Sequence, residues 1–277
     1  MRLSAEGVEL RYDRKVVARN LSLEIPDNQV SVLIGPNGSG KSTALKSLAR
    51  LLRPAGGRVL LDGASIQSLP TKEIARRLAI LPQVLTTPEA ITVEDLVWFG
   101  RHPHRRTVGA PSPQDREMVE WALRSTDTAA LRDQYVDQLS GGQRQRVWIA
   151  VCLAQQTDLL LLDEPTTFLD VTYQLELLDL LARLNGEEGK TIAMVLHDFN
   201  MAAEYADHIF VLAAGELVCQ GTPREVLTKE TMRTVFSLDV EIGVNPRSGR
   251  PLVIPLRRRP APHRVARQTV PGSPTRS

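Results

Sequence analysis

The sequence predicts an α/β fold in which a mostly parallel β-sheet is interrupted by an inserted helical segment. Two observations carry this prediction: short apolar strands alternate with amphipathic helices, and a glycine-rich loop joins one such strand to its helix. The chain has 277 residues, of which 42% are hydrophobic, so it is long enough to bury a large core. No run approaches roughly 18 consecutive apolar residues, so we expect no membrane-spanning segment.

The first elements are a hairpin, a strand and a helix. Residues 3–25 alternate in patches around a polar turn at 13–15, which is typical of a hairpin. The β-branched run at 30–34 predicts a buried strand, and apolar residues at helical spacing predict a helix over 44–52. The loop between them matches the pattern G-x-x-x-x-G-K-[ST] and consists of Gly35, Pro36, Asn37, Gly38, Ser39, Gly40, Lys41, Ser42 and Thr43.

This loop predicts binding of a nucleoside polyphosphate. Its glycines allow consecutive backbone N–H groups to turn toward phosphate oxygens without clashes from Cβ atoms. Lys41 is expected to reach the β- and γ-phosphates, and the hydroxyl of Ser42 to bind Mg²⁺. The start of the following helix adds N–H groups that favour the same anion.

The remaining elements follow in order. Capping patterns at Thr92 and at Ser112-Pro113 begin two helices of the inserted segment, with a polar loop over 101–111 between them. A small helical end starts at 221. The other predicted elements are strands at 56–63, 78–81, 159–162, 191–196, 209–212 and 216–220, and helices at 71–78 and 172–184.

Polar residues that could act on a phosphate follow two of the apolar strands. Asp163 and Glu164 end the strand at 159–162, and His197 ends the strand at 191–196. Ligands of an α/β sheet bind at the carboxyl ends of its parallel strands, so we expect these side chains beside the phosphate loop. There Asp163 would bind Mg²⁺, Glu164 would orient or deprotonate a water, and His197 would stabilise charge on the γ-phosphate.

A second anion site is predicted at the start of another helix. Ser140, Gly141, Gly142 and Gln143 place a hydroxyl and glycine N–H groups at that helix N-terminus. One nucleotide does not easily fill both sites within one subunit, so the pattern favours a partner chain.

With these motifs in hand, the chain resembles the nucleotide-binding subunits of ATP-binding cassette (ABC) transporters. The resemblance covers residues 1–256, and its motifs stand in the family's order: 35–43, Gln83, 139–143, 159–164 and His197. It implies a P-loop NTPase core of ABC type over 1–83 and 157–222, with an N-terminal antiparallel β subdomain. It further implies an inserted helical subdomain at 84–156 and a C-terminal extension at 223–256.

The resemblance also implies cofactors and partners. ATP and Mg²⁺ would lie between the phosphate loop of one subunit and residues 140–143 of a second copy, packed head to tail. Tyr12 matches the aromatic residue that stacks on adenine, and Asp170 matches the loop that contacts the partner's site. Gln83 matches the glutamine that touches Mg²⁺ or the water and couples the site to membrane permease subunits. The helical subdomain would dock on those permease subunits, and a substrate-binding protein would take part indirectly.

A closer resemblance concerns the transported substrate. Residues 87–93, 100–104, 195–200 and 249–255 are similar to importers of ferric siderophores. This resemblance implies a peripheral ATPase on the cytoplasmic face of the cell membrane. Three alternatives stay open: an importer ATPase for haem or cobalamin, a soluble ABC ATPase acting on ribosomes or DNA, and a nucleotide-gated binding module without catalysis.

The charge of the chain is uneven. Residues 257–277 hold six arginines and no acid, so they carry +6 while the rest of the chain carries −4 of the net +2. The body is therefore mildly acidic, and no basic, aromatic-interleaved face suggests nucleic acid as a partner. We expect the tail to be disordered and inert, with contact to anionic lipid as the alternative.

Overall fold

The computed structural model describes residues 2–13, 15–105 and 110–256. Its centre is a six-stranded sheet in the order β10-β9-β3-β8-β7-β6. All neighbouring pairs are parallel except β9 and β10, which form a hairpin, so the prediction of a mostly parallel sheet is confirmed. The strands are β3 (Val30–Ile34), β6 (Leu78–Leu81), β7 (Leu159–Leu162), β8 (Thr191–Val195), β9 (His208–Ala213) and β10 (Glu216–Gly221).

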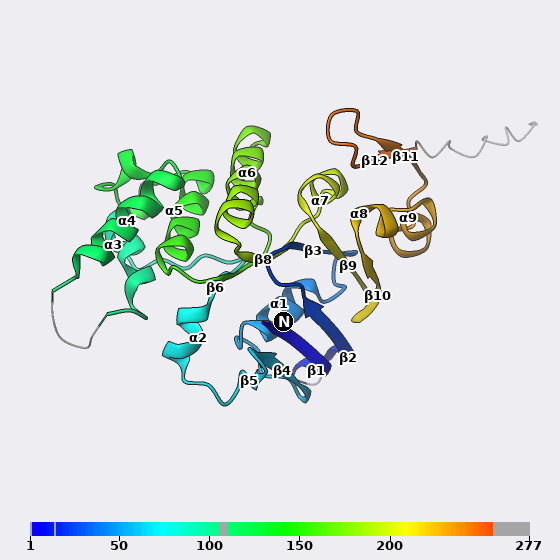
Figure 1. The fold of residues 1–277 in the computed structure, drawn as a ribbon, viewed down its shortest axis with the longest axis horizontal. Helices are drawn as coiled ribbons and strands as arrows, with labels where there is room; N and C mark the ends of the chain where they lie inside the picture. The colour runs from blue at the N-terminus through cyan, green and yellow to red at the C-terminus, as the bar shows by residue number, and fades with distance from the viewer. Residues whose placement is uncertain (1, 14, 106–109, 257–277) are drawn as a thin grey trace, which may run out of the picture.

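Both faces of this sheet are buried, as expected for parallel strands that are covered on each side. Val32 and Leu160 belong to a core shared with the helices α6 (Val171–Glu188) and α7 (Phe199–Tyr205). Their neighbours Leu33 and Leu161 point into a second core, shared with α1 (Lys41–Leu48) and a separate antiparallel sheet. Figure 1 shows α6 and α7 above the central sheet, and α1 and the antiparallel sheet below it.

The antiparallel sheet has the order β2-β1-β4-β5. Its strands β1 (Leu3–Tyr12) and β2 (Lys15–Ile25) form the predicted hairpin, and β1 also pairs with β4 (Gly56–Leu61). The short β5 (Ala64–Ser65) completes the sheet, and α2 (Thr71–Arg77) leads from it to β6. The hairpin brings Tyr12, at the end of β1, to one margin of this layer.

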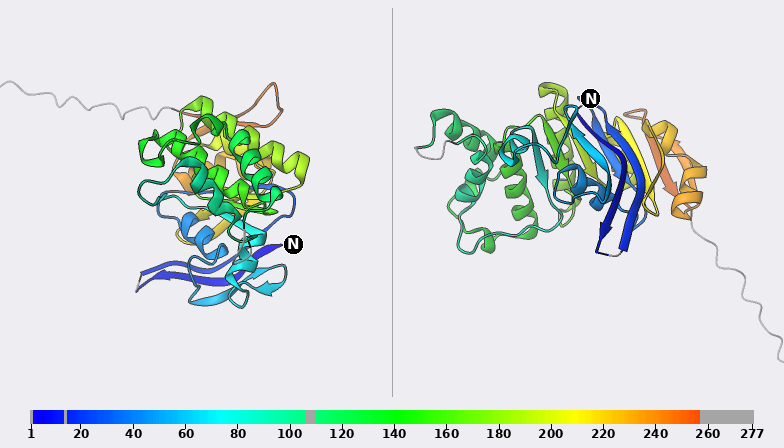
Figure 2. Two further views of the ribbon diagram at one scale, coloured as in Figure 1. Left: turned by 90° about the vertical axis from the view of Figure 1, so that its left-hand side faces the viewer. Right: turned by 90° about the horizontal axis from the view of Figure 1, so that it is seen from below.

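The helical segment between β6 and β7 packs on its own apolar residues. It contains α3 (Val93–Trp98), α4 (Pro113–Ser125) and α5 (Gly141–Ala154), with single 3₁₀ turns at Phe99–Arg101, Ala129–Leu131 and Val136–Gln138. The hydroxyls of Thr92 and Ser112 accept hydrogen bonds from Asp95 N and Asp115 N, which confirms both predicted N-caps. The views of Figures 1 and 2 agree that this segment lies at one end of the long axis of the molecule.

The C-terminal elements lie at the opposite end of that axis (Figure 2). They are α8 (Pro223–Val226), α9 (Lys229–Phe236) and the antiparallel pair β11 (Val240–Val244) and β12 (Pro251–Pro255). The expected disorder of 257–277 lies outside the described residues. None of the helices described is both long enough and apolar enough to cross a membrane. The division into domains at 83, 156 and 222 stays a prediction.

Two helices end several residues away from the boundary that the sequence predicts. The helix after the phosphate loop ends at Leu48 rather than at residue 52, because Arg50 adopts a positive φ of 60° and Leu51 is 59% exposed. The amide of Leu51 instead donates to the carbonyl of Lys46, which closes the end of the helix. The second difference is a longer α6, which continues four residues past Leu184 before Gly189 ends it with a left-handed backbone.

Candidate functional site

The phosphate loop connects the fully buried strand β3 to the first turn of α1. Gly38 and Gly40 have φ angles of 77° and 99°, which residues with a Cβ rarely adopt. The ammonium group of Lys41 folds back over the loop and donates to the carbonyls of Gly35 at 2.9 Å and Pro36 at 3.0 Å. Burial lowers the pKa of Lys41, although the charges of Glu164 and Asp163 oppose the shift. The loop thus holds a shielded cation that would gain from a polyphosphate.

The strand order explains why the other predicted residues meet this loop. Leu81, Leu162 and Met194 are aligned across β6, β7 and β8, and β8 lies next to β3. The residues that follow these strands therefore leave the same edge of the sheet. Ten of the predicted residues line one hollow there: Tyr12, Asn37, Gly38, Gly40, Lys41, Ser42, Thr43, Gln83, Glu164 and His197.

Asp163 is buried directly beside the loop. Its Oδ1 accepts a hydrogen bond from the Ser42 hydroxyl at 2.7 Å. Its Oδ2 is also buried, and no described residue offers it a hydrogen-bond partner. Burial raises the pKa of Asp163, while the bond from Ser42 acts against the increase. Buried polar atoms are rarely left unpaired, and oxygen atoms of this kind are ligands that Mg²⁺ prefers, so the donor set fits that ion.

Glu164 faces the hollow from an unusual backbone conformation, with φ of 54°. The Nε2 atom of His197 lies 2.8 Å from Glu164 Oε1, and Thr167 donates to Oε2 at 3.3 Å. Burial alone would raise the pKa of Glu164, but hydrogen bonds from His197 and Gln83 outweigh it and hold the pKa below the ordinary value. Glu164 is therefore an ionised acceptor at neutral pH. Left-handed backbone at a non-glycine residue stores strain and is often found where side chains must be aimed.

The hollow has a volume of about 610 Å³ and extends from the phosphate loop to Tyr12, which is 46% exposed. Four of its lining residues were not predicted from the sequence: Lys15, Val16, Val17 and Ala214. Lys15, Val16 and Val17 begin β2, and Ala214 lies in the turn between β9 and β10. Nothing in the sequence showed that the start of β2 and this turn meet at the phosphate loop.

The turn between β9 and β10 packs against the phosphate loop. Gly215 donates from its backbone N to the carbonyl of Ser39 at 3.1 Å. A Cβ on Gly215 would lie 2.1 Å from the carbonyl oxygen of Val17, so only glycine allows this approach. The hairpin that carries Tyr12 is therefore held in register with the phosphate loop.

Residues 140–143 do not reach this hollow. Ser140 caps α5, and it exchanges hydrogen bonds with Gln143 at 3.0 and 3.2 Å. Asp170 likewise caps α6, where its carboxylate accepts from Tyr173 N. A second hollow of about 540 Å³ lies beside this surface, lined by Gln83, Val84, Leu85, Gly141, Arg144, Gln145, Thr167 and Phe168. Gln83 borders both hollows, but the two anion-binding patterns remain apart within one subunit.

Comparison with known proteins places this geometry in a family. Residues 18–167 match the family described as ABC transporter, which is more than half of the chain. The chain belongs to the ABC transporter family. Within the family it is an ATP-binding subunit, and its activity is that of a transport ATPase.

Relatives match along nearly the whole chain. The ferric enterobactin transport ATP-binding protein FepC of Escherichia coli (strain K12) is 49% identical over 93% of this chain and 95% of its own. The iron(3+)-hydroxamate import ATP-binding protein FhuC of Bacillus subtilis (strain 168) is 46% identical over 91% of this chain and 94% of its own.

Among solved structures, the dimeric bacterial ABC transporter cassette MJ0796 superposes with a TM-score of 0.72. It is 30% identical and covers 80% of this chain and 99% of its own. The predicted ABC-type α/β fold, with its antiparallel sheet and helical segment, is thereby confirmed.

Proposed function

We propose that this chain hydrolyses ATP to drive import of an iron–siderophore complex through membrane permease subunits. Hydrolysis of ATP is supported by one observation above all: four side chains lie together at one edge of the central sheet, namely those of Lys41, Asp163, Glu164 and His197. The cargo is supported by relatives named for ferric enterobactin, iron(3+)-hydroxamate and achromobactin, which are 46–50% identical. A relative named for hemin import is 39% identical, so haem is the second candidate cargo.

Different residues at the hollow would bind different parts of Mg-ATP. Tyr12 offers its exposed ring to the adenine, and the loop 35–43 with Lys41 binds the phosphates. Ser42, Asp163 and Gln83 would hold Mg²⁺, which when bound neutralises charge on the phosphate oxygens. The free Oδ2 of Asp163 supports this assignment.

Glu164 and His197 would act at the γ-phosphate. The ionised carboxylate of Glu164 can accept a hydrogen bond from a water and orient it for attack. Because His197 Nε2 already lies within hydrogen-bonding distance of Glu164, the imidazole fixes the direction of that carboxylate and presents a donor at the same point. Loss of the carboxylate should affect hydrolysis far more than binding.

The separation of residues 140–143 from the hollow supports a composite site. In this proposal a second copy of the chain packs head to tail, so that its Ser140–Gln143 and Asp170 complete the site around each ATP. The dimeric cassette MJ0796 is a precedent for pairing within the family. The inserted helical segment at 84–156 would dock on permease subunits at the cytoplasmic side of the membrane, with Gln83 coupling them to the site and a substrate-binding protein supplying the cargo.

The test is a comparison of Glu164→Gln with Lys41→Ala and the unaltered chain. Glu164→Gln should keep nucleotide affinity, lose at least about 99% of phosphate release and accumulate as an ATP-bound dimer. Lys41→Ala should lose nucleotide affinity itself. Near-normal phosphate release by Glu164→Gln would refute the assigned role. Growth of a deletion strain on defined iron sources then tests the cargo, because failure on siderophore iron with normal growth on haem would exclude haem.

A further inference from the structure

The first turns of α5 and α6 contain the two predicted segments that do not line the nucleotide hollow. Residues 140–143 open α5, and Asp170 caps α6. The two helices belong to different parts of the fold: α5 packs on α3 and α4 of the inserted segment and also contacts β6, whereas α6 follows β7 of the central sheet. Contacts between the first turns of α5 and α6 therefore determine the position of residues 140–143 relative to Asp170.

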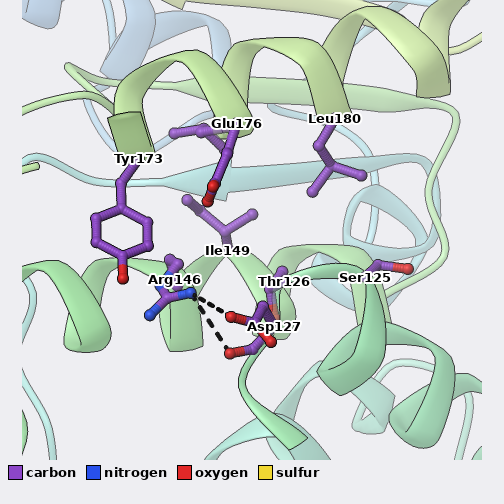
Figure 3. A pocket seen from close by; sticks show the side chains of 9 residues that line it. Ser125, Thr126, Asp127, Arg146, Ile149, Tyr173, Glu176 and Leu180 are labelled. Atoms are coloured by element: carbon purple, nitrogen blue, oxygen red, sulfur yellow. Dashed lines mark hydrogen bonds and ion pairs between the residues drawn. The ribbon is translucent and has the colours of Figure 1, made fainter. Parts of the chain in front are cut away.

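A stacked pair of side chains joins these two helices. The guanidinium carbon of Arg146, on α5, lies 4.5 Å from the centre of the Tyr173 ring, in the first turn of α6. Figure 3 shows the ring above the guanidinium, with Asp127 on the other side. Arg146 donates to Asp127 Oδ2 at 3.1 Å, and its side chain is only 14% exposed. Shielding from water strengthens the attraction between a cation and an aromatic face.

Tyr173 also donates to the N-cap of its own helix. Its backbone N donates to the carboxylate of Asp170 at 3.1 Å. One residue thus contacts Arg146 through its ring and Asp170 through its main chain. A displacement of Arg146 would be passed directly to the loop that contains Asp170.

Deeper in the molecule, the two helices share one apolar core, which includes Ile149 of α5 and Leu177 and Leu180 of α6. Other contacts lie nearer their first turns. Gln145 donates to the carbonyl of Pro165 at 3.1 Å, and Gly142 lies close to Leu169. Beside the stack, a cavity of about 60 Å³ lies between the helices (Figure 3). The Nε atom of Arg146 is buried and finds no hydrogen-bond partner in the described part of the chain. Since neither continuous packing nor a full set of hydrogen bonds holds the guanidinium, the Tyr173 ring and Asp127 set its position.

We propose that Tyr173 is a positioning residue, which holds the 140–143 turn and Asp170 in one rigid arrangement by stacking on Arg146. The inference rests on the proposed function, in which both segments act on the nucleotide of a partner subunit. Loss of the ring leaves the chain's own phosphate loop intact but lets the two segments shift against each other. Binding to the partner then weakens, while binding of ATP to the single subunit does not.

The experiment uses the full chain with Glu164→Gln, so that ATP is not consumed. Tyr173→Leu removes the aromatic face and keeps apolar bulk, and Tyr173→Phe is the matched control that keeps the face. Sedimentation with Mg-ATP should show a dimer dissociation constant raised about three- to thirtyfold in Tyr173→Leu and within about twofold in Tyr173→Phe. ATP affinity at concentrations where the chain is monomeric should be equal in all three proteins.

Two further measurements separate a positioning role from general damage. Arg146→Met should cause a loss similar to that of Tyr173→Leu, and the double variant should lose no more than either alone, because both remove one contact. Spin labels at the exposed Gln138 and Leu175, in a chain with Cys219→Ser, report the two segments without a partner. Their distance distribution should broaden in Tyr173→Leu and in Arg146→Met but not in Tyr173→Phe.

The outcomes distinguish this inference from the function on which it rests. Unchanged dimerisation in Tyr173→Leu, equal losses in Tyr173→Phe, additive losses in the double variant or reduced ATP affinity of the monomer would each overturn the positioning role. Failure of the parent chain to dimerise with ATP would refute the composite site instead. In that case the distance distribution still decides whether Tyr173 holds the two segments together.

Discussion

The helical segment depends on a buried ion pair that can be broken by one substitution. Arg101 is 2% exposed, and its Nε atom donates to Asp115 Oδ1 at 2.8 Å. The same guanidinium donates to the carbonyl of Ala154, at the end of α5, at 2.7 Å. Arg101 therefore ties the start of α4 to the end of the helix that begins with residues 140–143. We predict that Arg101→Leu destabilises the chain strongly.

The magnitude follows from what the substitution leaves behind. Removing one member of a buried ion pair typically costs about 3–5 kcal/mol, because the remaining charge is buried without its partner. Asp115 would keep its bonds to the hydroxyl and amide of Ser112, so we expect the lower limit, about 3 kcal/mol. In a protein of this size that loss corresponds to a fall in Tm of roughly 6–12 °C.

Thermal unfolding followed by circular dichroism measures this effect, with Arg124→Leu as the matched control. Arg124 lies in the same segment, but its side chain is 65% exposed and 3.7 Å from Glu120, so its removal should cost about 0–1 kcal/mol. Equal falls in Tm for the two variants would refute the reasoning, because burial would then make no difference to the pair.

The same pair predicts a dependence on pH. Burial alone would raise the pKa of Asp115, but hydrogen bonds from Ser112 and Arg101 overcome it and hold the pKa below its usual value. A lowered pKa stabilises the folded chain above about pH 4, and this contribution is lost as the pH falls through the folded pKa. The difference in unfolding free energy between the unaltered chain and Arg101→Leu should therefore shrink below about pH 4. A constant difference down to about pH 2 would contradict this explanation.

Three further predictions concern the nucleotide site. Gly215→Ala would place a methyl group against the Val17 carbonyl, so we expect the free energy of unfolding to fall by about 1–3 kcal/mol and ATP binding to weaken, both measured by calorimetry. Gly186→Ala, where a Cβ meets open space, is the control. Asp163→Asn should raise the Mg²⁺ concentration needed for half-maximal ATPase activity by at least about tenfold, and an unchanged requirement would exclude Asp163 as a ligand. Tyr12→Leu should weaken ATP binding about three- to tenfold, whereas Tyr12→Phe keeps the stacking face and should bind normally.

The sequence was informative wherever a local pattern determines a position. An apolar strand followed by polar residues locates Asp163, Glu164 and His197 at the edge of a parallel sheet, and the structure brings Glu164 and His197 within 2.8 Å. The order of the strands was not needed for this prediction, because all parallel strands share that edge. The capping patterns at Thr92 and Ser112 were equally local.

Contacts between distant segments could not be read in this way. The polar stretch 101–111 predicted a loop, yet its first residue, Arg101, is among the most buried side chains of the described chain. Its partners Asp115 and Ala154 lie 14 and 53 residues away, so no short window of sequence contains them. The approach of Gly215 to Val17 joins a turn to a strand about 200 residues earlier in the chain, and a glycine in a turn does not indicate which backbone it touches.

At Glu164, the residue that suits the backbone conformation best differs from the residue that the proposed chemistry requires. With φ at 54°, a glutamate at this position lowers the stability of the folded chain by about 1–2 kcal/mol. Glycine would avoid this cost, and asparagine would avoid part of it. A laboratory selection for heat resistance alone should therefore favour glycine or asparagine at 164. Every chain it recovers with those residues would lack the carboxylate that faces His197. Gains in Tm at this residue should thus coincide with loss of turnover, so thermostable variants of this protein are best sought with residue 164 held fixed.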